Sequence, residues 1–272
     1  MAKSTGSEEP LLLAIDISNT GIKFGIYPLK GDTLRARWRI ATVREKTADE
    51  YAMLLAELCR HAGVRLEAIA DVIVTCVVPQ LTPVVQQLAT QYLGREAIFI
   101  SHQLDLGIRL LVDNPRELGT DRIISALAAH RVYGGPAIVI QFGTATSFDC
   151  VSPEGDYLGG AIAPGLGISA EALARAGAQL YQVELVPPPS AIGKNTVHNM
   201  QSGIVFGHIG LVEGLVARLR KELPGGERAR IIAHGGLADL MANVTPSIDV
   251  VDPHLILRGL RVAYDRLRGE RA

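Results

Sequence analysis

The chain has 272 residues and a formal net charge of −1, and 48% of its residues are hydrophobic whereas only 5% are aromatic. This length allows one large core or two smaller ones, and the near-neutral charge excludes a strongly basic surface of the kind that binds nucleic acid or an anionic membrane. The three cysteines lack the paired spacing of a zinc site or a disulfide framework, which indicates a reduced, cytoplasmic setting. Residues 1–10 are polar, without the apolar core of a signal peptide, and no later segment predicts a membrane span. We expect residues 1–10 to be disordered.

The stretch from Leu11 to Tyr27 predicts two strands joined by a short polar turn at 18–21. The first apolar run reaches Asp16 just before this turn, and Lys23 follows it. Amides and hydroxyls of such a turn can face a phosphate, Lys23 can add a countercharge, and Asp16 can hold a hydrated Mg²⁺. An ordinary hairpin with a polar tip is the simpler interpretation while the stretch is taken alone.

The next segments alternate between strand and helix patterns. Residues 33–40 alternate cleanly, so we expect a half-buried strand whose row of arginines is a solvated face rather than an anion site. The segments predicted after it are a helix at 47–62 capped by Thr47 or Asp49, a buried strand at 71–78, a helix at 82–92 and a short strand at 97–100. This alternation predicts a sheet with parallel strand pairs and helices packed over it.

A helix that begins near Thr120 carries Asp121 and Arg122 in its first turn. An acid at this place commonly serves only to favour the helix dipole, and the local sequence favours that structural role. The functional alternative is that Asp121 accepts a proton from an alcohol while Arg122 holds a carboxylate.

Residues 137–151 repeat the opening pattern of apolar strand, polar residue, Gly/Thr turn and second strand. When Gln141 is aligned with Asp16, Gly143 and Thr144 fall on the polar turn of the first hairpin. The chain therefore resembles two related halves with one phosphate-binding hairpin each. Two facing hairpins would form a cleft that grips the phosphates of a nucleotide from both sides.

Two helices are predicted next, one opened by Ser169 and a long one at 196–223 for which Thr196 is the simplest cap. The long helix carries four glycines spaced by four, three and four residues, namely Gly203, Gly207, Gly210 and Gly214. Glycine weakens a helix by roughly 1 kcal/mol each, so close helix contact must compensate. We expect that contact inside the domain, with a dimer contact as the alternative.

A strand at 230–234 runs directly into Gly235 and Gly236. Such a pair lets the backbone approach a flat group such as adenine or ribose, and a tight strand-to-helix turn explains it equally well. The final helix, at 255–267, is expected to pack on the sheet of the second half.

Six motifs, in order, carry a resemblance to a known superfamily. They are DISNTGIKFG at 16–25, NPRELGTDR at 114–122, QFGTATSFD at 141–149, GGAIAPG at 159–165, IGKNTVHNMQSG at 192–203 and HGGLA at 234–238. Over nearly the whole chain after residue 10, it resembles the superfamily of acetate kinase, sugar kinases, heat-shock chaperone ATPases and actin, and within it the type III pantothenate kinases. The resemblance implies an α/β fold of two similar ribonuclease H-like halves, 11–132 and 133–272, with a nucleotide cleft between them.

The resemblance further implies transfer of the γ-phosphoryl group of ATP to the primary hydroxyl of pantothenate, the first step towards coenzyme A. It makes Asp121 the proton acceptor and Asp16 a ligand of Mg²⁺. The residues that it assigns to ATP are Asp16, Ser18, Asn19, Thr20, Lys23, Gly143, Thr144, Gly235 and Gly236. Those that it assigns to pantothenate are Gly119, Thr120, Arg122, Thr196 and Val112. It also implies a monovalent cation, K⁺ or NH₄⁺, at position 141, and a homodimer whose interface helps form the substrate site.

The chain departs from the family pattern at four positions. Ser18 replaces a usual glycine of the phosphate turn, Gln141 replaces the aspartate that binds the monovalent cation, and Val112 and Tyr181 replace a tyrosine and a proline near the substrate. A neutral amide adds no negative charge, which places potassium dependence in question.

Three hypotheses follow from these matches and departures. The first, which we favour, is an active pantothenate kinase, because both GTDR and GKNT are intact. The second is a nucleotide-binding paralogue with weak or no kinase activity that serves as a regulatory or accessory protein. The third is a kinase for another small hydroxylated carboxylate.

Overall fold

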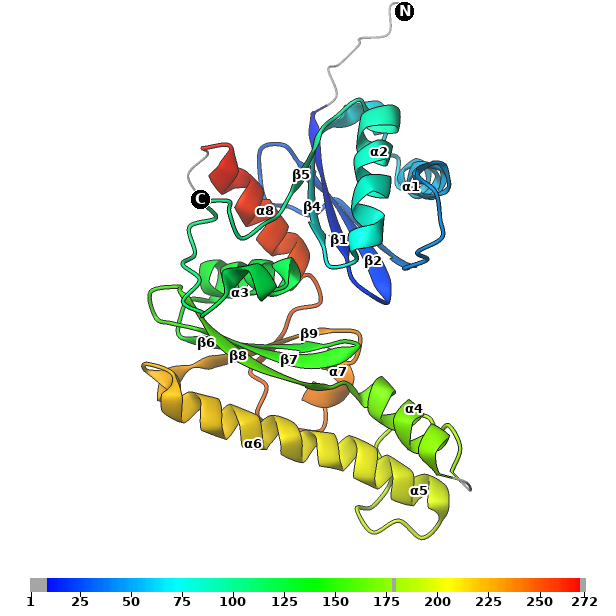
Figure 1. Ribbon diagram of the computed structural model, residues 1–272, viewed down its shortest axis with the longest axis vertical. Helices are drawn as coiled ribbons and strands as arrows, with labels where there is room; N and C mark the ends of the chain where they lie inside the picture. Colours follow the sequence, from blue (N-terminus) through cyan, green and yellow to red (C-terminus); the bar gives the residue numbers. More distant parts are fainter. Residues whose placement is uncertain (1–8, 178–179, 270–272) are drawn as a thin grey trace, which may run out of the picture. The chain divides into compact units, whose positions relative to one another are not determined.

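The computed structural model describes residues 9–177 and 180–269, which form two compact units (Figure 1). The first unit contains the described residues up to Leu106, the segment Arg116–Ile124 and those from Ile256 onward. The second contains Gly107–Pro115 and Ser125–Leu255. Compared with the halves expected at 11–132 and 133–272, residues 107–115 and 125–132 belong to the second unit, and those from Ile256 onward belong to the first.

We expected residues 1–10 to be disordered. Of these, residues 1–8 lie outside the described part of the chain. Glu9 and Pro10 make contacts: Glu9 forms an ion pair with Arg35, and the carbonyl of Pro10 accepts from the amide of Leu29 at 2.7 Å. These two residues therefore pack on the first unit and are not disordered, contrary to the expectation for them.

Five strands form the first sheet in the order β3-β2-β1-β4-β5. Their bounds are Leu11–Ile17 (β1), Gly21–Pro28 (β2), Ala36–Ala41 (β3), Ile69–Cys76 (β4) and Ala97–Phe99 (β5). Strand β1 is buried along its length and lies antiparallel to β2 and parallel to β4, as expected of an apolar run covered on both faces. Helices α1 (Ala48–His61) and α2 (Thr82–Leu93) pack on the face that carries Leu13 and Val74.

The second sheet repeats this arrangement in the order β8-β7-β6-β9-β10. Its strands are Ala137–Phe142 (β6), Ala145–Val151 (β7), Tyr157–Pro164 (β8), Arg230–Gly235 (β9) and Val250–Val251 (β10). Strand β6 is antiparallel to β7 and parallel to β9, as β1 is to β2 and β4. The predicted duplication is confirmed, because each sheet opens with one hairpin and places it at the same point of the strand order.

The remaining α-helices are α3 (Thr120–Tyr133), α4 (Leu166–Ala176), α5 (Thr196–Gln201), α6 (Gly207–Glu222), α7 (Ala238–Ala242) and α8 (Leu255–Leu267). A π-helical turn, Ser202–Phe206, joins α5 to α6. Two expected helix starts are wrong. Gly165 precedes α4, which therefore begins before Ser169. Asn195 caps α5 in place of Thr196, because its side chain accepts from the amide of His198 at 2.8 Å.

Helix α8 packs in the first unit, whereas the sequence had suggested the second sheet. A Cβ atom added to Gly25 of β2 would lie 3.2 Å from the side chain of Leu257, so the two elements are in close contact. Arg261 is 3% exposed, and it donates to the carbonyls of Pro28 and Leu29 at 2.8 and 3.0 Å. These bonds satisfy a buried guanidinium and fasten α8 to the end of β2.

The glycines of the long helix face outward, which makes the expectation of an interior contact wrong. Cβ atoms added at Gly203, Gly207 and Gly210 would meet nothing within 4 Å, and Gly214 would meet only Arg218 of the same helix. The helix Thr196–Glu222 is also long and apolar enough to cross a membrane, contrary to the expectation that no segment is. A single helix of this kind is weak evidence, because core helices of soluble proteins pass the same test.

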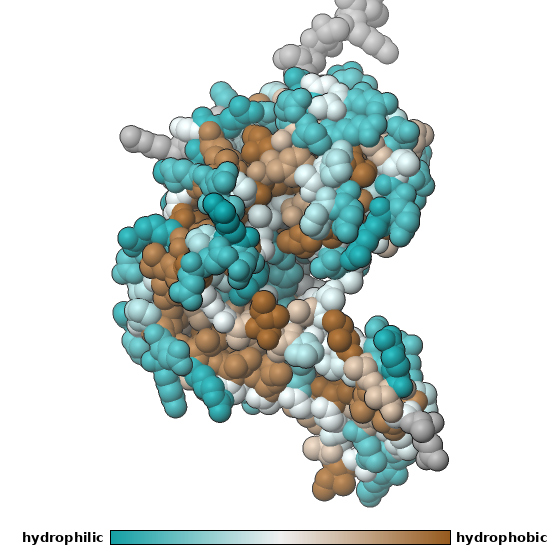
Figure 2. Space-filling model, in the orientation of Figure 1, coloured by the Kyte–Doolittle hydropathy of each residue, from teal (hydrophilic) through white to brown (hydrophobic). Residues whose placement is uncertain are grey.

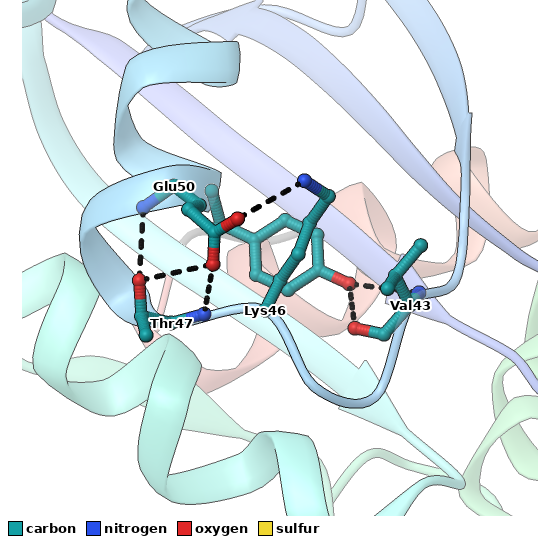
Figure 3. A network of polar contacts seen from close by, with 5 residues as sticks. Val43, Lys46, Thr47 and Glu50 are labelled. Atoms are coloured by element: carbon teal, nitrogen blue, oxygen red, sulfur yellow. Dashed lines mark hydrogen bonds and ion pairs between the residues drawn. The ribbon is translucent and has the colours of Figure 1, made fainter.

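The start of α1 is fixed by the polar network of Figure 3. The side chain of Thr47 accepts from the amide of Glu50 at 3.3 Å, and the carboxylate of Glu50 accepts from the amide of Thr47 at 2.9 Å. This capping box confirms Thr47 as the cap. The backbone amide of Thr47 also holds the pKa of Glu50 below its usual value.

Replacement of Thr47 tests this helix start. We expect Thr47→Ala to lower the free energy of unfolding by about 1 kcal/mol, because the amide of Glu50 loses its acceptor. Urea denaturation followed by circular dichroism measures the loss. Thr47→Ser keeps the hydroxyl and should retain most of the stability, so equal losses in the two variants would contradict this role.

Candidate functional site

The first hairpin carries a tightly closed polar turn between β1 and β2. The amide and the hydroxyl of Ser18 both donate to the carbonyl of Gly21 at 3.0 Å. Thr42 donates its hydroxyl to the carbonyl of Ser18 at 2.7 Å, and Arg44 donates to the amide oxygen of Asn19 at 3.3 Å. Serine is accommodated without strain, since no described residue other than glycine has a positive φ. Asn19 and Thr20 remain exposed at the tip of this turn.

Asp16 is a fully buried carboxylate at the end of the central strand β1. Its Oδ2 atom lies 3.4 Å from Nζ of Lys23, which is a long ion pair, and neither carboxylate oxygen accepts a hydrogen bond of normal geometry from the described residues. Burial raises the pKa of Asp16 from 3.8 to about 6, Lys23 opposes this shift, and the negative charge of Asp121 adds to it. A buried carboxylate without hydrogen bonds is costly, and its two oxygens fit the ligand chemistry of a cation.

Helix α3 brings its first turn to the same place. Thr75 of β4 is the neighbour of Asp16 across the parallel strands, and its hydroxyl lies 2.7 Å from the hydroxyl of Thr120. The negative charge of Asp121 is near enough to add to the rise in the pKa of Asp16 that burial causes. The first unit therefore brings the pair Asp16 and Lys23 near Thr120 and Asp121, from a distant part of the sequence.

Gly119 allows the carboxylate of Asp121 to fold back over the helix start. A Cβ atom at Gly119 would lie 2.7 Å from Oδ1 of Asp121, closer than any side chain tolerates. The same oxygen accepts from the amide of Arg122 at 2.9 Å. Glycine at this position thus leaves room for a carboxylate held in one orientation, and alanine would displace it.

The donor set at Asp16 fits a hydrated magnesium ion. The described residues contain no group of three or more His, Cys, Asp or Glu side chains that could hold a metal ion by themselves. Mg²⁺ is usually held by one or two carboxylates, with water and substrate phosphates supplying the other ligands. Asp16, with Asp121 near it, offers this kind of partial site.

The second hairpin is built in the same way but carries no charge at the corresponding position. Gln141 pairs with Ser147 of β7 and with His234 of β9, as Asp16 pairs with Lys23 and Thr75. Thr144 is exposed at the tip, and its carbonyl accepts from the amide of Gly165 at 3.2 Å. A hydrogen bond of 3.0 Å between His208 of α6 and Thr146 of β7 connects the long helix to this hairpin.

Close backbone approach explains several of the predicted glycines. A Cβ atom at Gly165 would lie 2.5 Å from the carbonyl oxygens of Gly143 and Thr144. Gly235 has a φ of 101°, and a Cβ atom there would lie 2.3 Å from the carbonyl oxygen of Phe142. Gly236 faces open space. The backbone at the end of β9 is thus packed against the second hairpin at Gly235 and open at Gly236.

The residues predicted to bind pantothenate fall in both compact units. Gly119, Thr120 and Arg122 belong to the first unit, whereas Val112 and Thr196 belong to the second. A Cβ atom added to Gly159 of β8 would lie 4.0 Å from Cγ1 of Val112, so Val112 lies beside this strand. Thr196 is exposed in the first turn of α5. Tyr181 is 54% exposed.

Sequence reasoning missed two residues that the structure places at the hairpins. Thr75 lies one residue before the end of β4, next to Asp16 of β1. The strand expected at 71–78 placed it in the middle, so no signal in the sequence marked it. Arg39 is exposed, as expected for the solvated row of β3. It also lies over the first turn, because a Cβ atom at Gly21 would be 2.8 Å from its Nε atom. No local pattern distinguishes Arg39 from its neighbours.

The raised pKa of Asp16 predicts how stability depends on pH. Between pH 3.8 and about 6 the folded protein keeps a proton on Asp16 that the unfolded chain has lost, so the free energy of unfolding falls as pH rises through this window. The shift corresponds to on the order of 3 kcal/mol. We expect Asp16→Asn to remove this loss, measured by urea denaturation across the window. Asp32→Asn, in an exposed loop, is the control, and a wild-type curve that matches the Asp16→Asn curve would contradict the shift.

Solved structures with this fold include distant relatives of several activities. The inorganic polyphosphate/ATP-glucomannokinase of Arthrobacter sp. strain KM has a TM-score of 0.52 at 18% identity, with 96% of this chain and 100% of that chain covered. Component A of the (R)-2-hydroxyglutaryl-CoA dehydratase of Acidaminococcus fermentans has a TM-score of 0.56 at 15% identity, with 95% and 99% covered. At these identities the likeness concerns the fold, and it confirms the predicted actin-like α/β class.

Closer relatives identify the family. The type III pantothenate kinase of Roseiflexus sp. (strain RS-1) is 50% identical over 258 residues, which cover 95% of this chain and 100% of the relative. That of Moorella thermoacetica is 48% identical over 256 residues, with 94% and 99% covered. The family model described as type III pantothenate kinase matches residues 12–218. The chain therefore belongs to the type III pantothenate kinase family.

Proposed function

We propose that this protein phosphorylates pantothenate with ATP to give 4'-phosphopantothenate, the first step of coenzyme A biosynthesis. The main support for the proposal is one cluster of polar side chains in the first unit. Asp16 and Lys23 of the first hairpin lie near Thr120 and Asp121 at the start of α3. Phosphoryl transfer depends mainly on positioning and on charge neutralisation. A buried carboxylate for a metal ion beside a second carboxylate for a hydroxyl proton meets both needs.

In this reaction Asp121 accepts the proton of the pantothenate hydroxyl while the hydroxyl oxygen forms a bond to the γ-phosphorus of ATP. The bond between that phosphorus and the bridging oxygen breaks, and ADP leaves with the electron pair. Mg²⁺ held by Asp16 would neutralise phosphate charge when bound. The bond from the amide of Arg122 orients Oδ1 of Asp121 for this role.

The other predicted site residues serve binding in this proposal. The tip residues Ser18, Asn19 and Thr20 and the second turn at Gly143 and Thr144 offer amides and hydroxyls to phosphates. Gly235 and Gly236 take the nucleoside. We assign Gly119, Thr120, Arg122, Thr196 and Val112 to pantothenate, with the guanidinium of Arg122 for its carboxylate.

Gln141 favours a second candidate function. It leaves the second hairpin neutral where the first has Asp16, so a nucleotide-binding paralogue with weak or no kinase activity, acting as an accessory protein, is the alternative. For the kinase itself, the same residue predicts activity that does not depend on K⁺ or NH₄⁺.

Formation of ADP decides between these functions. We expect the wild type to form ADP only when pantothenate is present, and Asp121→Asn to lose most of this activity because no group accepts the proton; general acid–base catalysis contributes roughly 10²- to 10⁴-fold. Equal background rates in wild type and Asp121→Asn would reject the kinase. A parallel series without pantothenate and at two potassium concentrations separates nucleotide hydrolysis and potassium dependence from the transfer.

We further propose that the protein is a cytoplasmic homodimer. The outward face of the long helix carries Gly203, Gly207, Gly210 and Gly214 with open space above the first three, and small residues allow close approach of a second helix. Figure 2 shows apolar surface gathered near α4 and α5, where Ile192 is 79% exposed and Leu173 is 40% exposed. An exposed apolar region of this kind commonly marks a protein interface.

A charged side chain on the glycine face tests this assembly. We expect wild type and Gly207→Ala to be dimers by light scattering, and Gly207→Glu to be a monomer, because the new side chain occupies the open space without disturbing the fold. A wild-type monomer, or a dimer of unchanged affinity for Gly207→Glu, would rule out this interface.

A further inference from the structure

We infer that Arg39 is a further nucleotide-binding residue, whose guanidinium holds the phosphate tail of ATP at the first hairpin. The inference rests on the proposed function in so far as that function requires ATP. Arg39 lies on β3, the edge strand of the first sheet, beside β2. None of the six sequence motifs contains Arg39.

The register places Arg39 in the row of site residues. Asp16 pairs with Lys23, and Lys23 pairs in turn with Arg39 across β2 and β3. Directly opposed residues in antiparallel strands present their side chains on the same face of the sheet. Arg39 therefore shares the face on which Asp16 and Lys23 form their ion pair.

The guanidinium of Arg39 reaches the phosphate turn. A Cβ atom added to Gly21, the residue that closes this turn, would lie 2.8 Å from Nε, 2.9 Å from Nη2 and 3.1 Å from Cζ of Arg39. The planar group thus covers the glycine. A side chain at Gly21 would push the guanidinium away from the turn, so glycine here preserves its place.

The charge of Arg39 is unneutralised within residues 9–177 and 180–269. Lys23 has Asp16 as its partner and Arg35 has Glu9, whereas the described side chains offer Arg39 no ion pair or hydrogen bond. Two cations directly opposed across strands destabilise a sheet. An anion between Lys23 and Arg39 would remove this repulsion, and a polyphosphate matches the forked donors of a guanidinium.

The chain that follows Arg39 is held rigidly against the same turn. Thr42 and Arg44 donate to Ser18 and Asn19 of the turn. The hydroxyl of Tyr51 donates to the carbonyl of Val43 at 2.7 Å and accepts from its amide at 3.0 Å. The segment from Arg39 to Arg44 is thus attached to the phosphate turn and to α1 by hydrogen bonds.

Calorimetric titration with a non-hydrolysable ATP analogue and, separately, with adenosine tests this role without pantothenate. We expect Arg39→Gln to weaken binding of the analogue by about tenfold to a hundredfold, the value of a charged hydrogen bond, and to leave adenosine binding unchanged. Arg39→Lys should recover part of the loss. Arg37→Gln is the matched control, because Arg37 lies on the same strand and face but opposite Gly25, farther from the turn.

Gly21→Ala provides an independent variant that keeps every charge and displaces the guanidinium; it should weaken the analogue and spare adenosine. The inference is overturned if Arg39→Gln binds the analogue as Arg37→Gln does, or if analogue and adenosine lose affinity equally. An active wild type with that result leaves the proposed function standing. Analogue binding that depends on Arg39, in a protein that forms no ADP with pantothenate, overturns the proposed function alone. A wild type that binds no nucleotide overturns both.

Discussion

The buried carboxylate of Asp16 is the constraint on which the rest of the site depends. Its removal from water costs free energy that the long ion pair with Lys23 offsets only in part, so its pKa rises to about 6. A central strand buried on both faces is needed to hold such a group in place. The sheet, with α8 on the face opposite α1 and α2, provides that burial and leaves the end of β1 facing the turn. Its neighbours Ile15 and Ile17 on the same strand belong to the large apolar core of the first unit, whose burial offsets this cost.

Duplication of the fold has left two hairpins of the same construction with different charge. The row in the first sheet consists of Lys23, Asp16 and Thr75, whereas that in the second consists of Ser147, Gln141 and His234. Charge for a metal ion and for phosphate is thus concentrated on the first hairpin. The second offers amides and hydroxyls around Thr144, which suit phosphate oxygens without adding any negative charge.

Glycines at the two hairpins and before α3 leave space, each for a different neighbouring group. Gly21 admits the guanidinium of Arg39, Gly119 admits the carboxylate of Asp121, and Gly165 and Gly235 admit backbone carbonyls of the second hairpin. Side chains at these places would displace the functional group or the turn itself. The glycines of the long helix differ, because they face open space and leave a surface to which another helix can come close.

The sequence by itself determined the two hairpins, the positions of Asp16 and Asp121 and the family, because these follow from local periodicity, turn chemistry and motif order. It left the cap of α1 open between Thr47 and Asp49, and the structure decided for Thr47. Only the tertiary structure decided which residues became neighbours. The contact of Thr75 with Thr120, the place of Arg39 over Gly21 and the packing of α8 against Gly25 depend on strand order and register. Those are set by burial over the whole chain, which no local pattern records. The predictions of an interior contact for the glycine face and of Thr196 as the cap were wrong for the same reason. The spacing of residues shows that a helix has a glycine face, but only the packing shows what lies against that face.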